Sequence, residues 1–374
     1  MSNSAETAGL QPLARSLEPL QEESLGGYLL RLSCRLRISP IELARLTGCA
    51  DEGRHARISR SLMLHLDARR FAPVARLSEA EAGSLALASW ADRYPPVARS
   101  LARRDVPRGS HDGWLFNMGQ RYCPDCLAGD GTPVQQAYGG PWKKHWLLPV
   151  AFACPRHRRF LREGCPQPHP GGANTWRLIA FPSACAEHPA ECRLSFQPGN
   201  TSRHRPYCGI RLDQPADDDP HRPSADVLAA QDRLLALFGP QHAAASAART
   251  FTDLRVLVAL VCLSWPLARD LMDHGPGTAA DEHVRFLSRG HGQLLDQQPR
   301  SVLAAAGLLT AALTVLDSPG MADTVARHLP ARRPGRLGPS SWMRVLSRHQ
   351  AGCSPALCDA VGGMPAADAD VRRA

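Results

Sequence analysis

Two short cysteine motifs near the middle of the chain could bind a metal ion. Cys123-Pro-Asp-Cys126 and Cys154-Pro-Arg-His157 each carry two ligands at the spacing of a zinc half-site. The proline after each first cysteine presets φ and leaves the later amide N–H groups free to bond a thiolate. Four Cys/His ligands leave no open position for water, so the pattern predicts a structural zinc site rather than a hydrolytic one. The alternative is a set of buried free thiols.

A second group of possible ligands lies in the segment 165–222, which is rich in proline, glycine, histidine and cysteine. Cys165-x3-His169 has half-site spacing, and an irregular segment of this kind needs something other than a hydrophobic core to hold it. The candidate ligands are Cys165, His169, Cys192 and Cys208, with Cys185 and His188 as competitors. The alternative is a loosely ordered loop with spare cysteines, because no second C-x2-C motif occurs here. The sequence therefore predicts one zinc site and allows a second.

The length and charge of the chain limit the classes of protein to which it can belong. At 374 residues the chain should form two or three domains, and 44% hydrophobic residues suffice for real cores. The formal net charge is +9, carried almost wholly by arginine, since Lys143 and Lys144 are the only lysines. Guanidinium groups pair well with phosphate, so this charge favours a polyanionic partner such as DNA.

Neither a secretory signal nor a membrane span is predicted. The first twenty residues lack a basic region followed by an apolar one. The most apolar window, Leu254 to Leu267, is interrupted by Arg255 and Pro266 and is shorter than the ~20 residues that a bilayer span needs. We therefore expect a cytoplasmic protein with no membrane association, whose clustered cysteines bind metal rather than form disulfides.

The N-terminal part should contain a helix-turn-helix. Ser24 can cap a helix with leucines on one face, and Ser39-Pro40 can start a second helix that ends near Gly48. Basic residues here and in the cysteine motifs could meet DNA phosphates and give a salt-sensitive, mostly sequence-independent affinity, although an arginine-rich helix face can also be simply solvated. The predicted phosphate-binding residues are Arg31, Arg35, Lys143, Lys144, Arg156 and Arg158.

The fold class follows as mainly α with small zinc-ribbon modules. Residues 142–152 should form short strands that deliver Cys154, and 158–162 should form one or two helical turns. Helices over 55–105 should break at Pro95-Pro96, and helices should return at 224–237, 252–263, 301–316 and 342–346. The predicted divisions are a helical domain with the helix-turn-helix at 1–110, a zinc-finger region at 111–222, a helical domain at 223–362 and a disordered tail at 363–374.

Several motifs taken together resemble the TniQ family, the target-selection proteins of transposons, which include TnsD. Residues 22–32 are similar to the family's opening signature, Glu-Glu-Ser-Leu-x-x-Tyr-Leu-x-Arg-Leu. The central signature is matched by Arg121-Tyr-Cys-Pro-x-Cys-Leu, Trp142, Trp146-x-Leu-Pro, Cys154-Pro-x-His157, Leu161 and Cys165-Pro.

This resemblance implies zinc binding by Cys123, Cys126, Cys154 and His157, and a second finger that starts at Cys165. Relatives tend to have Cys-Pro-x-Cys there, whereas this chain has Cys165-Pro-Gln-Pro-His169. It also ends sooner than TnsD-like relatives. The implied role is an adaptor that engages target DNA or a DNA-bound targeting complex and recruits a TnsC-like AAA+ ATPase, which in turn positions the transposase. A homodimer is one possible assembly.

The sequence favours an adaptor over an enzyme. Neither lysine lies in the Gly-x4-Gly-Lys-Ser/Thr loop that an ATPase of this kind needs, and the carboxylates form no obvious nuclease constellation. A zinc-containing helix-turn-helix transcriptional regulator is the alternative function. A third hypothesis, an enzyme that uses a thiol such as Cys165, conflicts with the use of these residues as ligands.

Overall fold

The structure is a computed structural model that describes residues 11–49, 60–103, 111–167, 169, 188–194, 207–214, 222–289, 297–329 and 346–362. Helices dominate these residues, and their strands form two small two-stranded sheets. The mainly helical fold class is therefore confirmed. The predicted tail at 363–374 and most of the predicted helix at 342–346 lie outside the described residues.

The N-terminal helices begin where the sequence places their caps. Ser24 Oγ accepts the Gly27 N–H at 3.1 Å, and Ser39 Oγ accepts the Glu42 N–H at 3.2 Å. Arg37, with φ of 55°, ends the first helix in the left-handed conformation. The helices are α1 (Leu25–Leu36), α2 (Pro40–Leu46), α3 (Arg60–Leu64), α4 (Ala68–Ala75), α5 (Glu79–Ser84) and α6 (Pro95–Ala102), with the 3-10 helix η1 (Leu87–Trp90).

The predicted break in the helical run falls at Tyr94, which is extended, and a new helix starts directly after it. Pro95 occupies the first position of α6, where a missing N–H group costs no hydrogen bond and the fixed φ suits the helix. Residues that the sequence presents as a helix breaker therefore initiate α6.

The middle of the chain differs from the sequence-based prediction in two places. Lys144–Leu147 form the 3-10 helix η2, so the strand before Cys154 is only β2 (Ala153–Cys154). Arg158–Arg162 do not form helical turns, because β3 (Arg159–Phe160) folds back antiparallel onto β2. β1 (Arg121–Tyr122) pairs antiparallel with β4 (Arg162–Glu163), and short helices α7 (Pro124–Ala128) and α8 (Pro133–Tyr138) lie between β1 and η2.

One of the C-terminal helices is longer than its predicted cap suggests. α10 (Ala244–Leu263) begins eight residues before the predicted start at Thr252, because the side chains of Thr252 and Asp253 serve other contacts. Thr252 Oγ1 donates back to the Ala248 carbonyl, and Asp253 accepts the Ser354 N–H at 2.8 Å. The other helices are α9 (Ala225–Ala236), η4 (Leu267–Leu271), α11 (His274–Arg289), α12 (Val302–Leu316), α13 (Met321–His328), η5 (Gln350–Gly352) and α15 (Pro355–Gly362).

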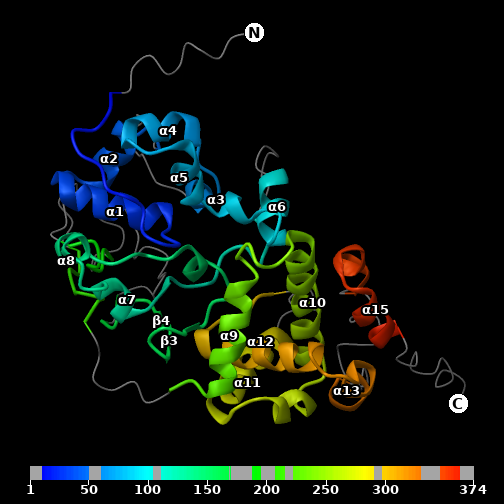
Figure 1. Cartoon of the computed structure of the whole chain (residues 1–374). Helices are drawn as coiled ribbons and strands as arrows, with labels where there is room; N and C mark the ends of the chain where they lie inside the picture. Colours follow the sequence, from blue (N-terminus) through cyan, green and yellow to red (C-terminus); the bar gives the residue numbers. More distant parts are fainter. Residues whose placement is uncertain are drawn as a thin grey trace, which may run out of the picture.

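Figure 1 shows the N-terminal helices above the cysteine motifs and the C-terminal helices beside and below them. One connected cluster of buried apolar residues runs through all three parts. At the junction of α6 with the C-terminal helices, Tyr94 packs edge-on against Phe251 with ring centroids 4.9 Å apart. This cluster is continuous across the predicted domain boundaries, and those boundaries remain predictions.

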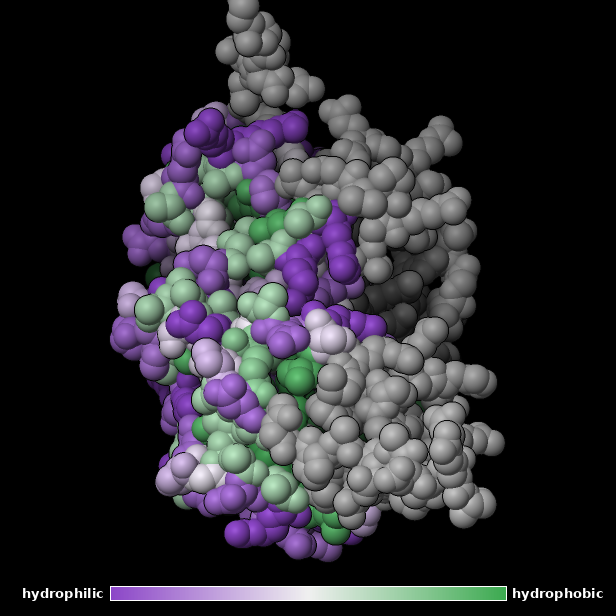
Figure 2. Space-filling model, turned by 90° about the vertical axis from the view of Figure 1, so that its right-hand side faces the viewer, coloured by the Kyte–Doolittle hydropathy of each residue, from purple (hydrophilic) through white to green (hydrophobic). Residues whose placement is uncertain are grey.

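Among the described residues, none of the helices combines the length and apolar character of a membrane span. On the face drawn in Figure 2, hydrophobic areas alternate with hydrophilic ones over the coloured part of the surface.

Candidate metal centre

The first cluster consists of Cys123, Cys126, Cys154 and His157. Cys123 follows β1 and is the N-cap residue of α7, which carries Cys126 one turn later. Cys154 ends β2, and His157 lies in the tight turn between β2 and β3. The two small sheets therefore bring two ligand pairs together from positions about thirty residues apart, as the sequence predicts.

The geometry of the first cluster fits a tetrahedral zinc ion. His157 Nδ1 lies 3.3 Å from Cys126 Sγ and 3.4 Å from both Cys123 Sγ and Cys154 Sγ. Cys126 Sγ and Cys154 Sγ are 3.6 Å apart. Zinc bonds of ~2.3 Å to sulfur and ~2.0 Å to nitrogen give tetrahedral edges of about 3.8 Å between sulfurs and about 3.5 Å between sulfur and nitrogen. The side chains are thus already placed as zinc would place them.

Electrostatics also favour a cation at this point. Hydrogen bonds with Cys126 and Cys154, together with burial, raise the pKa of Cys123, while the same sulfur contacts lower the pKa of Cys154. Three crowded thiols cannot all ionise unless a positive charge lies among them. Beside the cluster, Asp125 Oδ2 accepts a hydrogen bond from Arg159 at 2.8 Å and lies 3.9 Å from Cys123 Sγ.

The second cluster consists of Cys165, His169, Cys192 and Cys208, the ligand set favoured by the sequence. Cys165 Sγ lies 3.7 Å from Cys208 Sγ, and Cys192 Sγ lies 3.8 Å from His169 Nε2. All four ligand atoms lie within 4.8 Å of one another. These edges are slightly longer than those of the first cluster but suit the same Cys3His coordination.

Backbone pairing explains how the distant cysteines of the second cluster meet. The Cys192 N–H donates to Ile210 O at 2.8 Å, and the Cys208 N–H donates to Leu194 O at 2.9 Å. His188, a predicted competitor, uses its Nδ1 to accept the Ala190 N–H at 3.1 Å and is not in the cluster. Cys185 lies outside the described residues.

Two of the residues predicted to contact DNA have buried side chains. Arg31 is 0% exposed and pairs with Glu23 inside the N-terminal core. Lys144 is 5% exposed, lies 4.1 Å above the Trp90 ring and donates to Ser89 Oγ at 2.8 Å. Burial lowers the pKa of Lys144 to about 8. Neither residue can reach a phosphate in this structure.

The other four predicted DNA contacts divide into two pairs. Arg35 is half-buried with its guanidinium 5.5 Å from the Tyr138 ring centre, and Lys143 Nζ lies 3.3 Å from Glu22 Oε2. Arg156 and Arg158 are exposed and flank His157 in the turn of the first cluster. These two arginines are the best placed of the six for contact with a polyanion.

The side chains that hold the first cluster against the C-terminal helices could not be found from the sequence. Gln231 of α9 accepts backbone hydrogen bonds from Phe152 and Ala153, which lie about eighty residues earlier in the chain. Glu163 of β4 accepts the Val302 N–H across a separation of 139 residues. Neither residue belongs to a motif whose spacing could signal such a contact.

These features define a mainly helical protein with two Cys/His clusters compatible with structural zinc. Residues 14–161, less than half of the chain, match the TniQ family model, and this match supports a TniQ-family protein; the family is associated with DNA transposition. The matched range contains the first cluster, whereas the second cluster and α9 to α15 follow it. Neither a curated protein nor a solved structure matches the chain.

Proposed function

We propose that this chain is a cytoplasmic adaptor for target selection in DNA transposition. It engages target DNA or a DNA-bound targeting complex and recruits a AAA+ ATPase that positions the transposase. The observation that carries the proposal is the TniQ match over residues 14–161. The convergence of both Cys/His clusters supports it, because the family resemblance implies metal-held fingers in this part of the chain.

In this proposal both zinc ions hold structure. Three thiolates and one imidazole would fill the coordination sphere at each cluster, which leaves no position for a substrate or an activated water. At the first cluster, the zinc would tie two distant ligand pairs together in a region that already packs into the connected apolar core. The chain itself would perform no catalytic step.

The nucleic-acid component of this function is assigned to Arg156 and Arg158. Both are exposed on the turn that carries His157, so zinc would fix the backbone from which they extend. Contacts of this kind position a protein on DNA without reading its sequence. Recognition of a particular target would then need a further contact or a partner complex.

The alternative function, a helix-turn-helix transcriptional regulator, has less support from the contacts of α1. Arg31 of that helix is fully buried, and Arg35 lies against Tyr138. A helix whose basic residues are used in protein contacts offers little to a phosphate backbone. Gene neighbourhood separates the two functions, since an adjacent transposase and AAA+ ATPase would support the adaptor.

A pull-down tests the adaptor function. Tagged full-length protein is incubated with the AAA+ ATPase encoded beside its gene, with ATP and with or without duplex DNA. We expect the ATPase to be retained, and retention should fall in Cys123→Ser protein that has lost one zinc ion. No retention under any of these conditions would contradict the proposal.

A further inference from the structure

Gln231 holds the strand that presents a ligand of the first cluster. Its side chain is 0% exposed on α9. Oε1 accepts the N–H groups of Phe152 at 2.6 Å and Ala153 at 2.9 Å, and Nε2 donates to Val150 O at 3.3 Å. This amide therefore satisfies three backbone groups in the few residues directly before Cys154.

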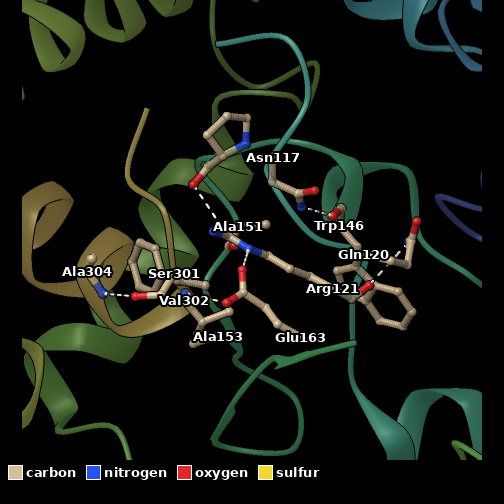
Figure 3. A network of polar contacts seen from close by, with 12 residues as sticks. Asn117, Gln120, Arg121, Trp146, Ala151, Ala153, Glu163, Ser301, Val302 and Ala304 are labelled. Carbon is tan, nitrogen blue, oxygen red and sulfur yellow. Dashed lines mark hydrogen bonds and ion pairs between the residues drawn. The ribbon is translucent and has the colours of Figure 1, made fainter. Parts of the chain in front are cut away.

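Glu163 makes a corresponding contact from the other small sheet. Its Oε1 pairs at 2.9 Å with Arg121, which lies two residues before Cys123 and is itself 0% exposed. Its Oε2 accepts the N–H of Val302, the first residue of α12, at 3.1 Å. Figure 3 shows Glu163 between the Arg121 guanidinium and the start of α12. A carboxylate at a helix N-terminus is stabilising, because the first amides of a helix have no partner within it.

Arg121 connects this contact to the first one. Its Nη1 donates to the carbonyls of Pro149 at 3.1 Å and Ala151 at 2.6 Å. The segment 149–153 is thus held from one side by Arg121 and from the other by Gln231. A shift of either ligand strand would leave buried amide or carbonyl groups of this network without partners, and such groups are costly to leave unpaired.

We propose that Gln231 and Glu163 are positioning residues for the first cluster and that zinc occupancy there holds α9 and the first turn of α12 in place. The proposal rests on zinc binding, which belongs to the proposed function. Coupling of this kind is reciprocal, so loss of the Gln231 amide should weaken zinc retention and zinc removal should loosen α9 and α12. The cluster and the C-terminal helices then form one metal-dependent unit rather than an autonomous finger and a separate domain.

Hydrogen–deuterium exchange on the full chain tests the effect of zinc on the helices. Peptides from α9 and from residues 302–306 are followed in the zinc-loaded protein and after chelation, with α4 as an internal reference. We expect exchange about tenfold faster or more in α9 and at the start of α12, with a smaller change in α4. Unchanged exchange in α9 and α12 after zinc has left, or an equal acceleration in α4, would overturn the proposal.

Variants at position 231 test the reverse direction. Gln231→Leu removes the acceptor of the Phe152 and Ala153 amides, so one of the two zinc ions should transfer to a chromophoric chelator about 10-fold faster, as for other residues that support metal ligands. Gln231→Glu keeps an acceptor oxygen and should recover part of the retention. Asp232→Asn, at an exposed site on the same helix, is the control and should behave as wild type.

The outcomes separate this inference from the metal proposal. If the wild-type protein holds two zinc ions and Gln231→Leu releases zinc at the wild-type rate, the inference is overturned and the metal proposal stands. Wild-type protein that retains no zinc would overturn both. Circular dichroism and exchange in α4 show whether Gln231→Leu is folded. If it is not, Gln231→Glu and Glu163→Gln provide the release rates, and wild-type release from both would also overturn the inference.

Discussion

Glu23 and Arg31 form an ion pair, with Oε2 and Nη1 2.8 Å apart and both side chains 0% exposed. Burial raises the pKa of Glu23 to about 7 even though Arg31 lies beside it. The next residue, Ser24, donates its N–H to Trp142 O at 2.8 Å. A Cβ atom at Gly27 would lie only 2.7 Å from Trp142 Cβ. The opening signature of the family thus builds a contact with the cysteine region.

Loss of one member of this pair should destabilise the N-terminal part strongly. Arg31→Met leaves the Glu23 carboxylate buried without its cation, and such losses cost about 3–5 kcal/mol. Urea denaturation followed by circular dichroism measures the cost. Arg15→Met, at an exposed position, is the matched control and should change stability by no more than about 0.5 kcal/mol. Similar midpoints for both variants would contradict the structural role of Arg31.

Metal analysis should give two zinc ions per chain. Cys154→Ser should lower this to one, because the first cluster then has two thiolates and one imidazole for a site that needs about four ligands. Native mass spectrometry counts the ions directly. Cys358→Ser removes a half-buried thiol outside both clusters and should keep both ions. Two zinc ions in Cys154→Ser would show that the first cluster is not a zinc site.

The second cluster can be tested through its histidine. His169→Ala should lose one zinc ion and keep the other, because its Nε2 lies beside Cys192 Sγ. His188→Ala is the matched control from the same segment and should keep both ions, since His188 bonds to backbone instead. If the His188 variant lost a zinc ion and the His169 variant kept both, then His188 rather than His169 would be the zinc ligand.

DNA affinity should depend on the turn of the first cluster. Arg156→Ala combined with Arg158→Asn should weaken duplex binding at all sequences and reduce the salt slope by about 1 for each phosphate that is no longer neutralised. Asparagine is chosen at position 158 because φ there is 50° and asparagine tolerates that region. Fluorescence anisotropy over a salt series measures both effects. Arg249→Ala on α10 is the control, and an equally weakened affinity in that variant would exclude a specific role for the turn.

A buried histidine should make the protein sensitive to acid. His283 of α11 is 2% exposed, neither ring nitrogen has a hydrogen-bond partner, and burial lowers its pKa to about 4. Arg300 nearby lowers the pKa further in the same direction. The folded state therefore resists protonation that the unfolded chain accepts below about pH 6.5. Stability due to this group is fully present above pH 6.5 and is lost as the pH falls towards 4.

His283→Leu should remove this sensitivity. Wild-type protein should lose about 2 kcal/mol more than the variant between pH 7 and pH 5, as follows from a pKa of about 4 in the folded state and about 6.5 in the unfolded state. The variant should also be at least as stable as wild type at pH 7, since an unpaired polar group leaves the core. Urea midpoints at the two pH values measure the difference. If wild type and variant lost the same stability between pH 7 and pH 5, the acid sensitivity would belong to other groups.

Local chemistry predicts much of this molecule. The helix caps at Ser24 and Ser39 and the half-sites Cys123-x2-Cys126, Cys154-x2-His157 and Cys165-x3-His169 can be found because half-site spacing and capping depend on residues a few positions apart. The prediction of helical turns after His157 is wrong, because this short sequence carries no periodicity and strand pairing with β2 decides its conformation. Burial of Lys144 cannot be predicted in the same way, since it depends on Trp90 and Ser89, which lie outside its own motif. Burial of Arg31 depends on Glu23, which precedes the helix that carries Arg31.

The contacts of Gln231 bear on how this protein could have diversified. The family match ends at residue 161, yet the strand carrying Cys154 obtains two hydrogen bonds from a helix that begins at Ala225. Recombination that joined the matched segment to a foreign C-terminal half would supply no amide at that position. A chimaera of this chain should therefore exchange the matched segment and α9 together, because Phe152 and Ala153 would otherwise lose their buried acceptor.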